Sequence, residues 1–189
     1  EAIRADLSAA ADPARAPQMQ AYMKSTMPFL GVRLPDVRQI ALGAARDNQV
    51  TELSDIRELI VQLWDHATYR EERYAATSLF RLRQVKGQLA FVDLYESVAT
   101  GGAWWDYVDD LARHVSALLD AHPQDASTVV LGWSRHADFW LNRLAIISQL
   151  GRRDQVDTAL LTEVIRPHIA DREFFIRKSI GWALRDYAR

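Results

Sequence analysis

Pairs of adjacent aromatic residues recur at a fixed interval in the second half of the chain. Three such pairs follow one another at steps of 35 residues: Trp104-Trp105, Phe139-Trp140 and Phe174-Phe175. One further step back lies Tyr69-Arg70, a weaker copy of the same motif. A repeat of about this length, with two helices per unit, is typical of α-solenoids of the HEAT or armadillo type, in which each helix pair buries its apolar face only by stacking on its neighbours.

Helical periodicity dominates the rest of the sequence. The stretch TELSDIRELIVQLWDHA at residues 51–67 places apolar residues at three- and four-residue steps, and the stretches at 139–150 and 174–188 do the same. We find no convincing alternating strand pattern and no Asn-Gly or Asp-Gly hairpin turn. The sequence therefore predicts an all-α fold of roughly ten helices. We expect these to form one HEAT-like repeat domain over residues 1–189, an α-solenoid of stacked antiparallel helix pairs with a concave face.

Cap and break residues divide these helices. Pro35 suits the first turn of a helix, and Thr51 or Ser54 is expected to cap the helix that follows. The predicted breaks in the second half are Gly101-Gly102, His122-Pro123 and Gly151.

Composition excludes several classes of protein and of site. The chain has no cysteine, which excludes disulfides and thiolate metal sites. It has no apolar run long enough to cross a membrane and no signal-peptide pattern. The histidines lack metal-ligand spacing, and neither a phosphate-binding glycine loop nor a serine-hydrolase elbow is present. The lack of cysteine fits a cytosolic protein, and these patterns point to no metal or cofactor site.

Charge is unevenly distributed along the chain. Residues 1–133 carry 13 basic and 18 acidic residues, whereas residues 134–189 carry 10 basic and 7 acidic residues. A net charge of −2 is weak support for nucleic-acid binding by the whole molecule. The basic last third would still permit a local nucleic-acid-binding face.

Polar and aromatic residues recur at a similar level of the last three repeats. Trp105 and Asp109 are four residues apart and share one side of a helix. Arg143 lies among apolar residues one repeat later, and Trp182 lies one turn from Lys178. These side chains could converge on the concave face. Alternatively, Asp109 and Arg143 form a buried ion pair and the tryptophans belong to the core, because buried charges need partners.

Four segments together carry a resemblance to a known family. They are YMKSTMPFLGVRLPDVRQI, WWDYVDDL, FWLNRLAIISQL and EFFIRKSIGWALRDYAR, spread over nearly the whole chain. In this order and at these separations they resemble the DNA alkylation repair family, the AlkD-like HEAT-like repeat DNA glycosylases. The family usually carries a further C-terminal helical segment, which we expect this chain to lack.

The resemblance implies a function. Members of the family hold duplex DNA on a concave basic surface and remove positively charged alkylated purines, such as 7-methylguanine and 3-methyladenine, by cleaving the N-glycosidic bond. The implied role is base excision repair of alkylation damage, with double-stranded DNA that contains alkylated purines as the partner. With this resemblance we expect a monomer of the bacterial cytoplasm or nucleoid that needs no metal and no cofactor.

The resemblance also implies roles for particular residues. Asp109 matches the catalytic aspartate, Trp105 and Trp182 match the two cleft tryptophans, and Arg143 matches the arginine that binds the DNA backbone. Further DNA-binding residues expected from the same motifs are Arg177 and Lys178, and the expected packing or cleft-wall residues are Tyr22, Phe174 and Phe175.

The chemistry agrees with these roles. Alkylation at N3 or N7 puts a positive charge on the purine, which then leaves without protonation by a general acid. The sugar develops cationic character, which the carboxylate of Asp109 could stabilise while it positions water. Indole faces attract cations by roughly 0.5–2 kcal/mol each. Two other functions stay open: a non-catalytic protein that binds damaged or branched DNA, and a protein-interaction scaffold.

Overall fold

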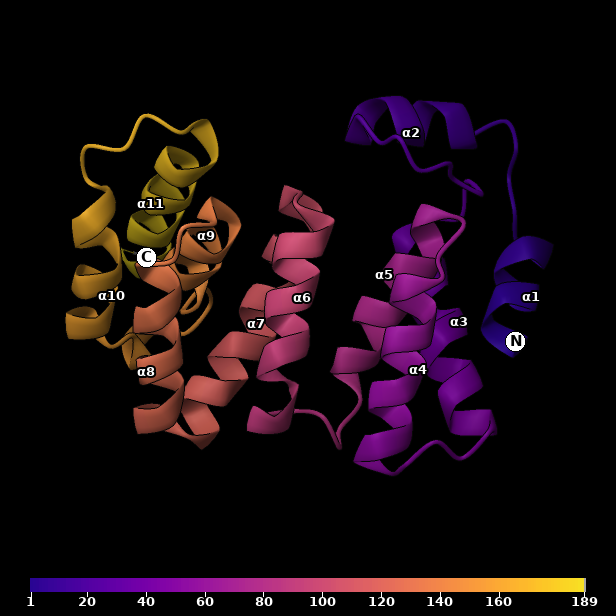
Figure 1. Cartoon of the computed structure of the whole chain (residues 1–189), viewed down its shortest axis with the longest axis horizontal. Coiled ribbons are helices and arrows are strands. Elements are labelled where there is room, and N and C mark those ends of the chain that lie inside the picture. The colour runs from indigo at the N-terminus through magenta and orange to yellow at the C-terminus, as the bar shows by residue number, and fades with distance from the viewer. Residues whose placement is uncertain (189) are drawn as a thin grey trace. The chain divides into compact units, whose positions relative to one another are not determined.

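The computed structural model describes residues 1–188, and these form eleven α-helices with short 3-10 turns and no strand (Figure 1). Arg189, the last residue of the fourth motif and of the predicted domain, lies outside the described residues. The helical fold confirms the all-α prediction. Each described helix is too short or too polar to cross a membrane.

The chain divides into two compact units, Glu1–Val85 and Lys86–Arg189. The N-terminal unit contains α1 (Ala2–Ala9), α2 (Ala16–Met23), α3 (Leu34–Asp47), α4 (Leu53–Asp65) and α5 (Arg70–Ser78). The C-terminal unit contains α6 (Val92–Gly102), α7 (Trp105–Ala121), α8 (Pro123–Ser134), α9 (Phe139–Ile147), α10 (Thr158–Ile165) and α11 (Phe174–Tyr187). The prediction of one repeat domain over the whole chain stays a prediction.

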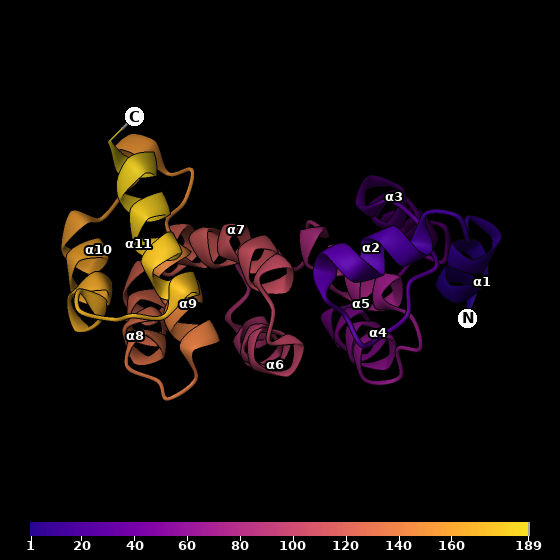
Figure 2. The same cartoon turned by 90° about the horizontal axis from the view of Figure 1, so that it is seen from above.

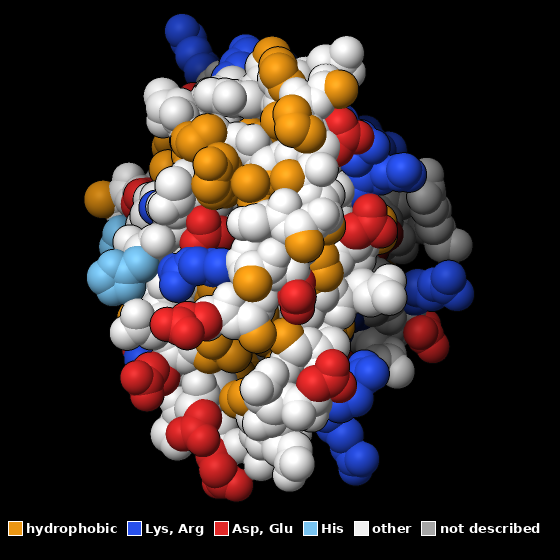
Figure 3. Space-filling model, turned by 90° about the vertical axis from the view of Figure 1, so that its right-hand side faces the viewer, with side chains coloured by type: hydrophobic (Ala, Val, Ile, Leu, Met, Phe, Trp, Pro, Cys, Tyr) orange, Lys and Arg blue, Asp and Glu red, His pale blue; other side chains and the backbone are white. Residues whose placement is uncertain are grey.

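In the N-terminal unit, α5 is the central helix. It packs against α3 and α4, while α1 packs against α3. Helix α2 runs across the end of this group, over α5 (Figures 1 and 2). Figure 3 shows the α1 side of the unit, where acidic, basic and apolar side chains are interspersed. This face therefore carries no single-sign charge that would attract a nucleic acid.

A buried carboxylate joins α5 to the segment that follows α2. Glu71 is fully buried and accepts hydrogen bonds from the backbone N–H groups of Leu30, Gly31 and Val32, at 2.9, 2.8 and 3.1 Å. Gly31 has φ +87°, and a Cβ atom there would lie 2.1 Å from the carbonyl oxygen of Asp12. Only glycine fits this turn, and the turn presents its N–H groups to the carboxylate.

The C-terminal unit is built in two layers. Helices α7, α9 and α11 pack side by side in one layer, while α8 and α10 pack together in the other. Successive helices α6 and α7, then α8 and α9, pack as neighbouring pairs. Leu111, Val115 and Leu144 are among the fully buried side chains between the layers. This arrangement agrees with paired helices, although the solenoid and its concave face remain predictions.

The aromatic doublets mark the starts of corresponding helices. Helix α7 begins at Trp105, α9 at Phe139 and α11 at Phe174, and α5 begins at Arg70 in the weaker copy. These starts are 35, 34 and 35 residues apart, so the repeat in the sequence corresponds to the interval between helix starts. The predicted breaks are also confirmed, since α6 ends at Gly102, α8 begins at Pro123 and Gly151 has φ +81°.

The predicted caps are confirmed in part. Pro35 lies in the first turn of α3, as expected. The prediction that Thr51 or Ser54 caps α4 is wrong, because Glu52 occupies the N-cap position and makes no side-chain capping bond. Ser54 lies inside the helix, where its hydroxyl is 3.2 Å from a carboxylate oxygen of Asp55. Thr51 lies one residue too early to cap it.

Candidate functional site

An ion pair joins α7 to α9. The Arg143 guanidinium donates from Nε to Oδ1 of Asp109 at 2.8 Å and from Nη2 to Oδ2 at 2.9 Å. A third donor of Arg143, Nη1, bonds the backbone carbonyl of Phe175 at the start of α11, at 2.7 Å. One arginine therefore ties together the three helices that begin with the aromatic doublets. Paired hydrogen bonds of this kind fix the orientation of a carboxylate as well as holding its charge.

The two charges differ in their access to solvent. The Arg143 side chain is 5% exposed, whereas the Asp109 side chain is 19% exposed. Burial raises the pKa of Asp109 to about 6, while the charge and hydrogen bonds of Arg143 oppose the shift and the charge of Asp106 adds to it. The result is an oriented, partly accessible carboxylate that titrates close to neutral pH. Such a group is a common feature of functional sites.

Local sequence explains why Arg143 needs this partner. Every residue of α9 from Trp140 to Ile147 is buried, so only a small part of the Arg143 side chain reaches solvent and most of the guanidinium needs a partner inside the protein. On α7, Asp109 lies next to the fully buried Val108, at the edge of the apolar side of that helix. A buried cation without a partner would be strongly destabilising, and Asp109 supplies the opposite charge. The ion pair that the sequence left open as an alternative is thus present.

The doublets form a continuous aromatic cluster beside the ion pair. Trp104 packs against both Trp140 and Phe175, with ring centroids 6.2 and 5.7 Å away. Trp140 and Phe175 are 4.9 Å apart, and Arg143 lies 5.8 Å from the Phe175 ring centroid. Offset and edge contacts at these distances are favourable. Trp104 therefore has a packing role, and the second residue of each later doublet, Trp140 or Phe175, shares it.

The remaining predicted site residues of the C-terminal unit are less buried. Trp105, one turn before Asp109 on α7, is partly buried, whereas Trp182 on α11 is 39% exposed. Arg177 and Lys178 are both exposed on α11. The Lys178 ammonium lies 5.5 Å from the ring centroid of Phe174, which is itself 58% exposed. The structure thus pairs Lys178 with Phe174, and places Phe175 against Arg143.

Tyr22 belongs to the N-terminal unit. It lies on α2 and is 74% exposed. Its predicted role as a cleft-wall residue stays a prediction, as do the catalytic and DNA-binding roles of the other residues.

Sequence reasoning missed the residues that set the helix starts. The side chains of Asp138 and Glu173 accept hydrogen bonds from the backbone N–H groups of Trp140 and Phe175, at 2.8 and 3.3 Å. Each acidic residue directly precedes an aromatic doublet, which is a recognisable N-cap signal. The carbonyl of Phe175 was also missed, because a backbone acceptor leaves no trace in the sequence. Over residues 1–188, no cluster of three or more His, Cys, Asp or Glu side chains could hold a metal ion.

Comparison with known proteins shows what the chain is similar to. Among curated proteins, no match was found. Among solved structures, the fold is similar to a predicted DNA alkylation repair enzyme from Enterococcus faecalis, with a TM-score of 0.83 and 26% sequence identity. The similarity covers 94% of this chain and 83% of that one. A family model described as DNA alkylation repair enzyme matches residues 3–189, and the chain therefore belongs to the family of DNA alkylation repair enzymes.

Proposed function

We propose that this protein is a DNA glycosylase that hydrolyses the N-glycosidic bond of positively charged N3- and N7-alkylated purines in duplex DNA. Membership of the DNA alkylation repair family supports action on alkylated DNA. The observation that carries the glycosylase reaction is the Asp109 carboxylate, which Arg143 holds through two hydrogen bonds while part of it stays exposed.

The substrate makes the first half of the reaction easy. An alkylated purine already carries a positive charge, so it leaves as a neutral base when the glycosidic electron pair moves onto it. No acid is needed at the base. The difficulty passes to the sugar, which becomes an oxocarbenium-like cation as the bond breaks.

Asp109 would act on that sugar. An ionised carboxylate placed beside the anomeric carbon stabilises the developing positive charge, and its oxygen orients the water that attacks the same carbon. Because Arg143 fixes both carboxylate oxygens, little reorganisation is needed when the charge forms. The proton released by the water can pass to Asp109, whose pKa of about 6 makes it a competent base at neutral pH.

Arg143 would have two tasks. A guanidinium has five N–H donors, and three of them are used on Asp109 and on the Phe175 carbonyl. Two donors remain for a phosphate oxygen of the DNA backbone. A phosphate held there would position the lesion relative to Asp109 without reading base sequence.

The tryptophans would select for charge. Trp105 lies one turn before Asp109 on α7, and Trp182 offers an accessible indole on α11. Indole faces attract cations by roughly 0.5–2 kcal/mol each, which favours an alkylated nucleotide over a normal one. Arg177 and Lys178 would add phosphate contacts on the exposed side of α11. We place the protein in the cytoplasm, where it would act as a monomer without a cofactor.

The test is release of 7-methylguanine from a methylated duplex by the wild-type protein and by Asp109→Asn. We expect release by the wild type and a large loss in the variant. If a folded wild-type protein binds methylated DNA without releasing base, the protein is a non-catalytic DNA-binding protein. If the protein neither releases base nor is retained on heparin, the result favours a protein-interaction scaffold.

A further inference from the structure

Helix α11 carries an exposed stripe in which a cation lies between two aromatic side chains. Phe174, Lys178 and Trp182 follow one another at four-residue steps, so they project from the same side of the helix. Phe174 is 58% exposed and Trp182 is 39% exposed. The buried side of the same helix is formed by Ile176, Ser179 and Ala183.

Two members of the stripe, Phe174 and Lys178, are in contact. The Lys178 ammonium lies 5.5 Å from the Phe174 ring centroid, a cation–π distance. Phe174 also meets Phe175 edge to face, with centroids 5.3 Å apart and planes at 81°. Since Phe175 packs on the buried Trp140, the exposed Phe174 ring is anchored to the aromatic cluster beside the ion pair. Its position is therefore set by packing even though more than half of it faces solvent.

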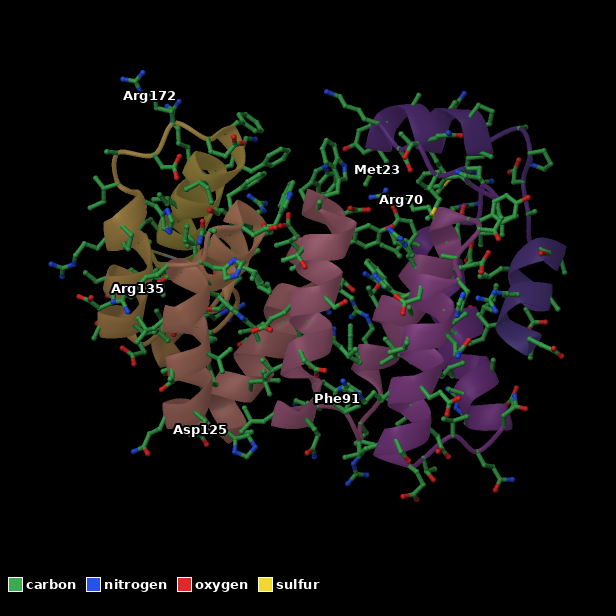
Figure 4. The ribbon with its side chains drawn as sticks, viewed as in Figure 1. Met23, Arg70, Phe91, Asp125, Arg135 and Arg172 are labelled. Carbon is green, nitrogen blue, oxygen red and sulfur yellow. The ribbon has the colours of Figure 1, made fainter. Side chains whose placement is uncertain are left out.

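The end of the stripe that carries Phe174 and Lys178 favours an anion, whereas the next four-residue step beyond its other end reaches the carboxylate of Asp186. Arg177 is an exposed neighbour of Lys178. Arg172 is exposed in the loop before α11, and its side chain points away from the ribbon (Figure 4). These cations border the end of the stripe that carries Phe174.

The two carboxylates near that end are engaged in local structure. Asp171 accepts from the backbone N–H of Glu173 at 2.8 Å and lies 3.5 Å from the imidazole of His168. Glu173 accepts from the backbone N–H of Phe175. These bonds orient the two carboxylates toward the backbone of the turn, whereas Arg177 and Lys178 are exposed to solvent and available to a polyanion.

We propose that this stripe binds undamaged single-stranded nucleic acid, with bases stacked on Phe174 and Trp182 and the intervening phosphate at Lys178. Phe174 and Trp182 are eight residues apart, which is about 12 Å along an α-helix. Alternating aromatic faces and cations are the means by which proteins bind single strands without reading sequence. The binding requires neither an alkylated base nor the Asp109 carboxylate, so it extends beyond the glycosylase reaction.

The first experiment measures the affinity of the full chain for a fluorescently labelled oligothymidylate by anisotropy. Phe174→Ala should weaken binding roughly tenfold, because one stacked base is lost. Phe174→Trp keeps an aromatic face and should retain binding. The matched control is Tyr187→Ala, which removes an exposed aromatic from a different side of α11 and should leave the affinity unchanged. Circular dichroism verifies that each variant is folded.

The second measurement separates stacking from charge. An oligomer of abasic sites has the same phosphates without bases, and it should bind more weakly than oligothymidylate and be insensitive to Phe174→Ala. Lys178→Gln should reduce the salt dependence of oligothymidylate binding. The slope of the logarithm of the binding constant against the logarithm of the salt concentration should become shallower by about 0.7.

Several outcomes would overturn the proposal. One is equal affinity of the wild type and Phe174→Ala for oligothymidylate. Another is that the wild type binds the abasic oligomer as tightly as it binds oligothymidylate. Absence of single-strand binding by a protein that releases 7-methylguanine would remove this site and leave the glycosylase intact. Single-strand binding through Phe174 by a protein that releases no base would support this site and contradict the proposed glycosylase activity.

Discussion

Asp109 and Arg143 lie 34 residues apart in the sequence and meet through two parallel hydrogen bonds between α7 and α9. The guanidinium is almost wholly buried, whereas the carboxylate keeps an exposed edge. The pair is therefore asymmetric: its cation stabilises the packing of three helices, and its anion remains available to a substrate. The proposed chemistry and the stability of the C-terminal unit depend on the same two side chains.

Replacement of the carboxylate tests the catalytic role directly. Asp109→Asn keeps the size of the side chain and loses its charge, so we expect release of 7-methylguanine to fall by about 10²-fold or more. The matched control is Asp120→Asn on the same helix, where an exposed carboxylate pairs with Arg152 at the surface. That variant should release base at the wild-type rate. Equal rates for Asp109→Asn and the wild type would exclude a catalytic role for the carboxylate.

The pH dependence of release follows from the pKa of Asp109. The proposed chemistry needs the ionised carboxylate, and its pKa is about 6. Single-turnover release should therefore rise as pH increases from 5 to 7 and then level off. The measurement uses a purified methylated duplex and subtracts the release that occurs without protein at each pH. A profile that is flat from pH 5 to pH 8 would contradict the assignment.

The same pKa has a consequence for stability. The native pKa of about 6 lies above the ordinary value of 3.8, so the folded state holds the proton more tightly than the unfolded state. Ionisation of Asp109 thus lowers the free energy of unfolding as pH rises from about 4 to about 6, by at most about 3 kcal/mol. Urea unfolding at pH 4 and at pH 7 should show this decline in the wild type. The decline should be smaller in Asp109→Asn, and identical changes in both proteins would argue against the raised pKa.

Sequence reasoning predicted the fold class well because the repeat leaves a strong signal. The aromatic doublets correspond to helix starts, and Gly102 and Pro123 bound helices as expected. It was less successful where one side chain serves two elements. The sequence placed Asp109 and Arg143 at a similar level of adjacent repeats, yet it could not decide between a phosphate-binding arginine and an ion pair. That decision depends on side-chain burial and on the Phe175 carbonyl, neither of which a residue pattern encodes.

Arg143 can be tested for its two proposed tasks in one series. Arg143→Ala removes the charge that lowers the Asp109 pKa, so the midpoint of the pH profile for base release should move above 6. If the two remaining N–H donors hold a phosphate, the same variant should lower the salt dependence of duplex binding by about 0.9 in the log–log slope. Arg166→Ala, an exposed arginine paired with Glu163, is the control for general charge loss. A shifted pH midpoint with an unchanged salt slope would restrict Arg143 to orienting Asp109.

The N-terminal unit offers a stability test that is independent of catalysis. The Glu71 carboxylate accepts three backbone N–H groups through its two oxygens, and it is fully buried. Glu71→Gln replaces one acceptor oxygen with an NH₂ donor that faces N–H groups, so at least one buried donor loses its partner. We expect a loss of about 1–3 kcal/mol in the free energy of unfolding. The control is Glu58→Gln on α4, where the side chain is exposed and the change should be below about 0.5 kcal/mol.

The location of the loss should also be specific. Because Glu71 holds residues 30–32, amide hydrogen exchange should accelerate first in the segment that connects α2 to α3. Exchange in α7, α9 and α11 should change little at low denaturant, since those helices belong to the other compact unit. Unchanged exchange at residues 30–32 in Glu71→Gln would show that the turn is held by its glycine geometry and not by the carboxylate.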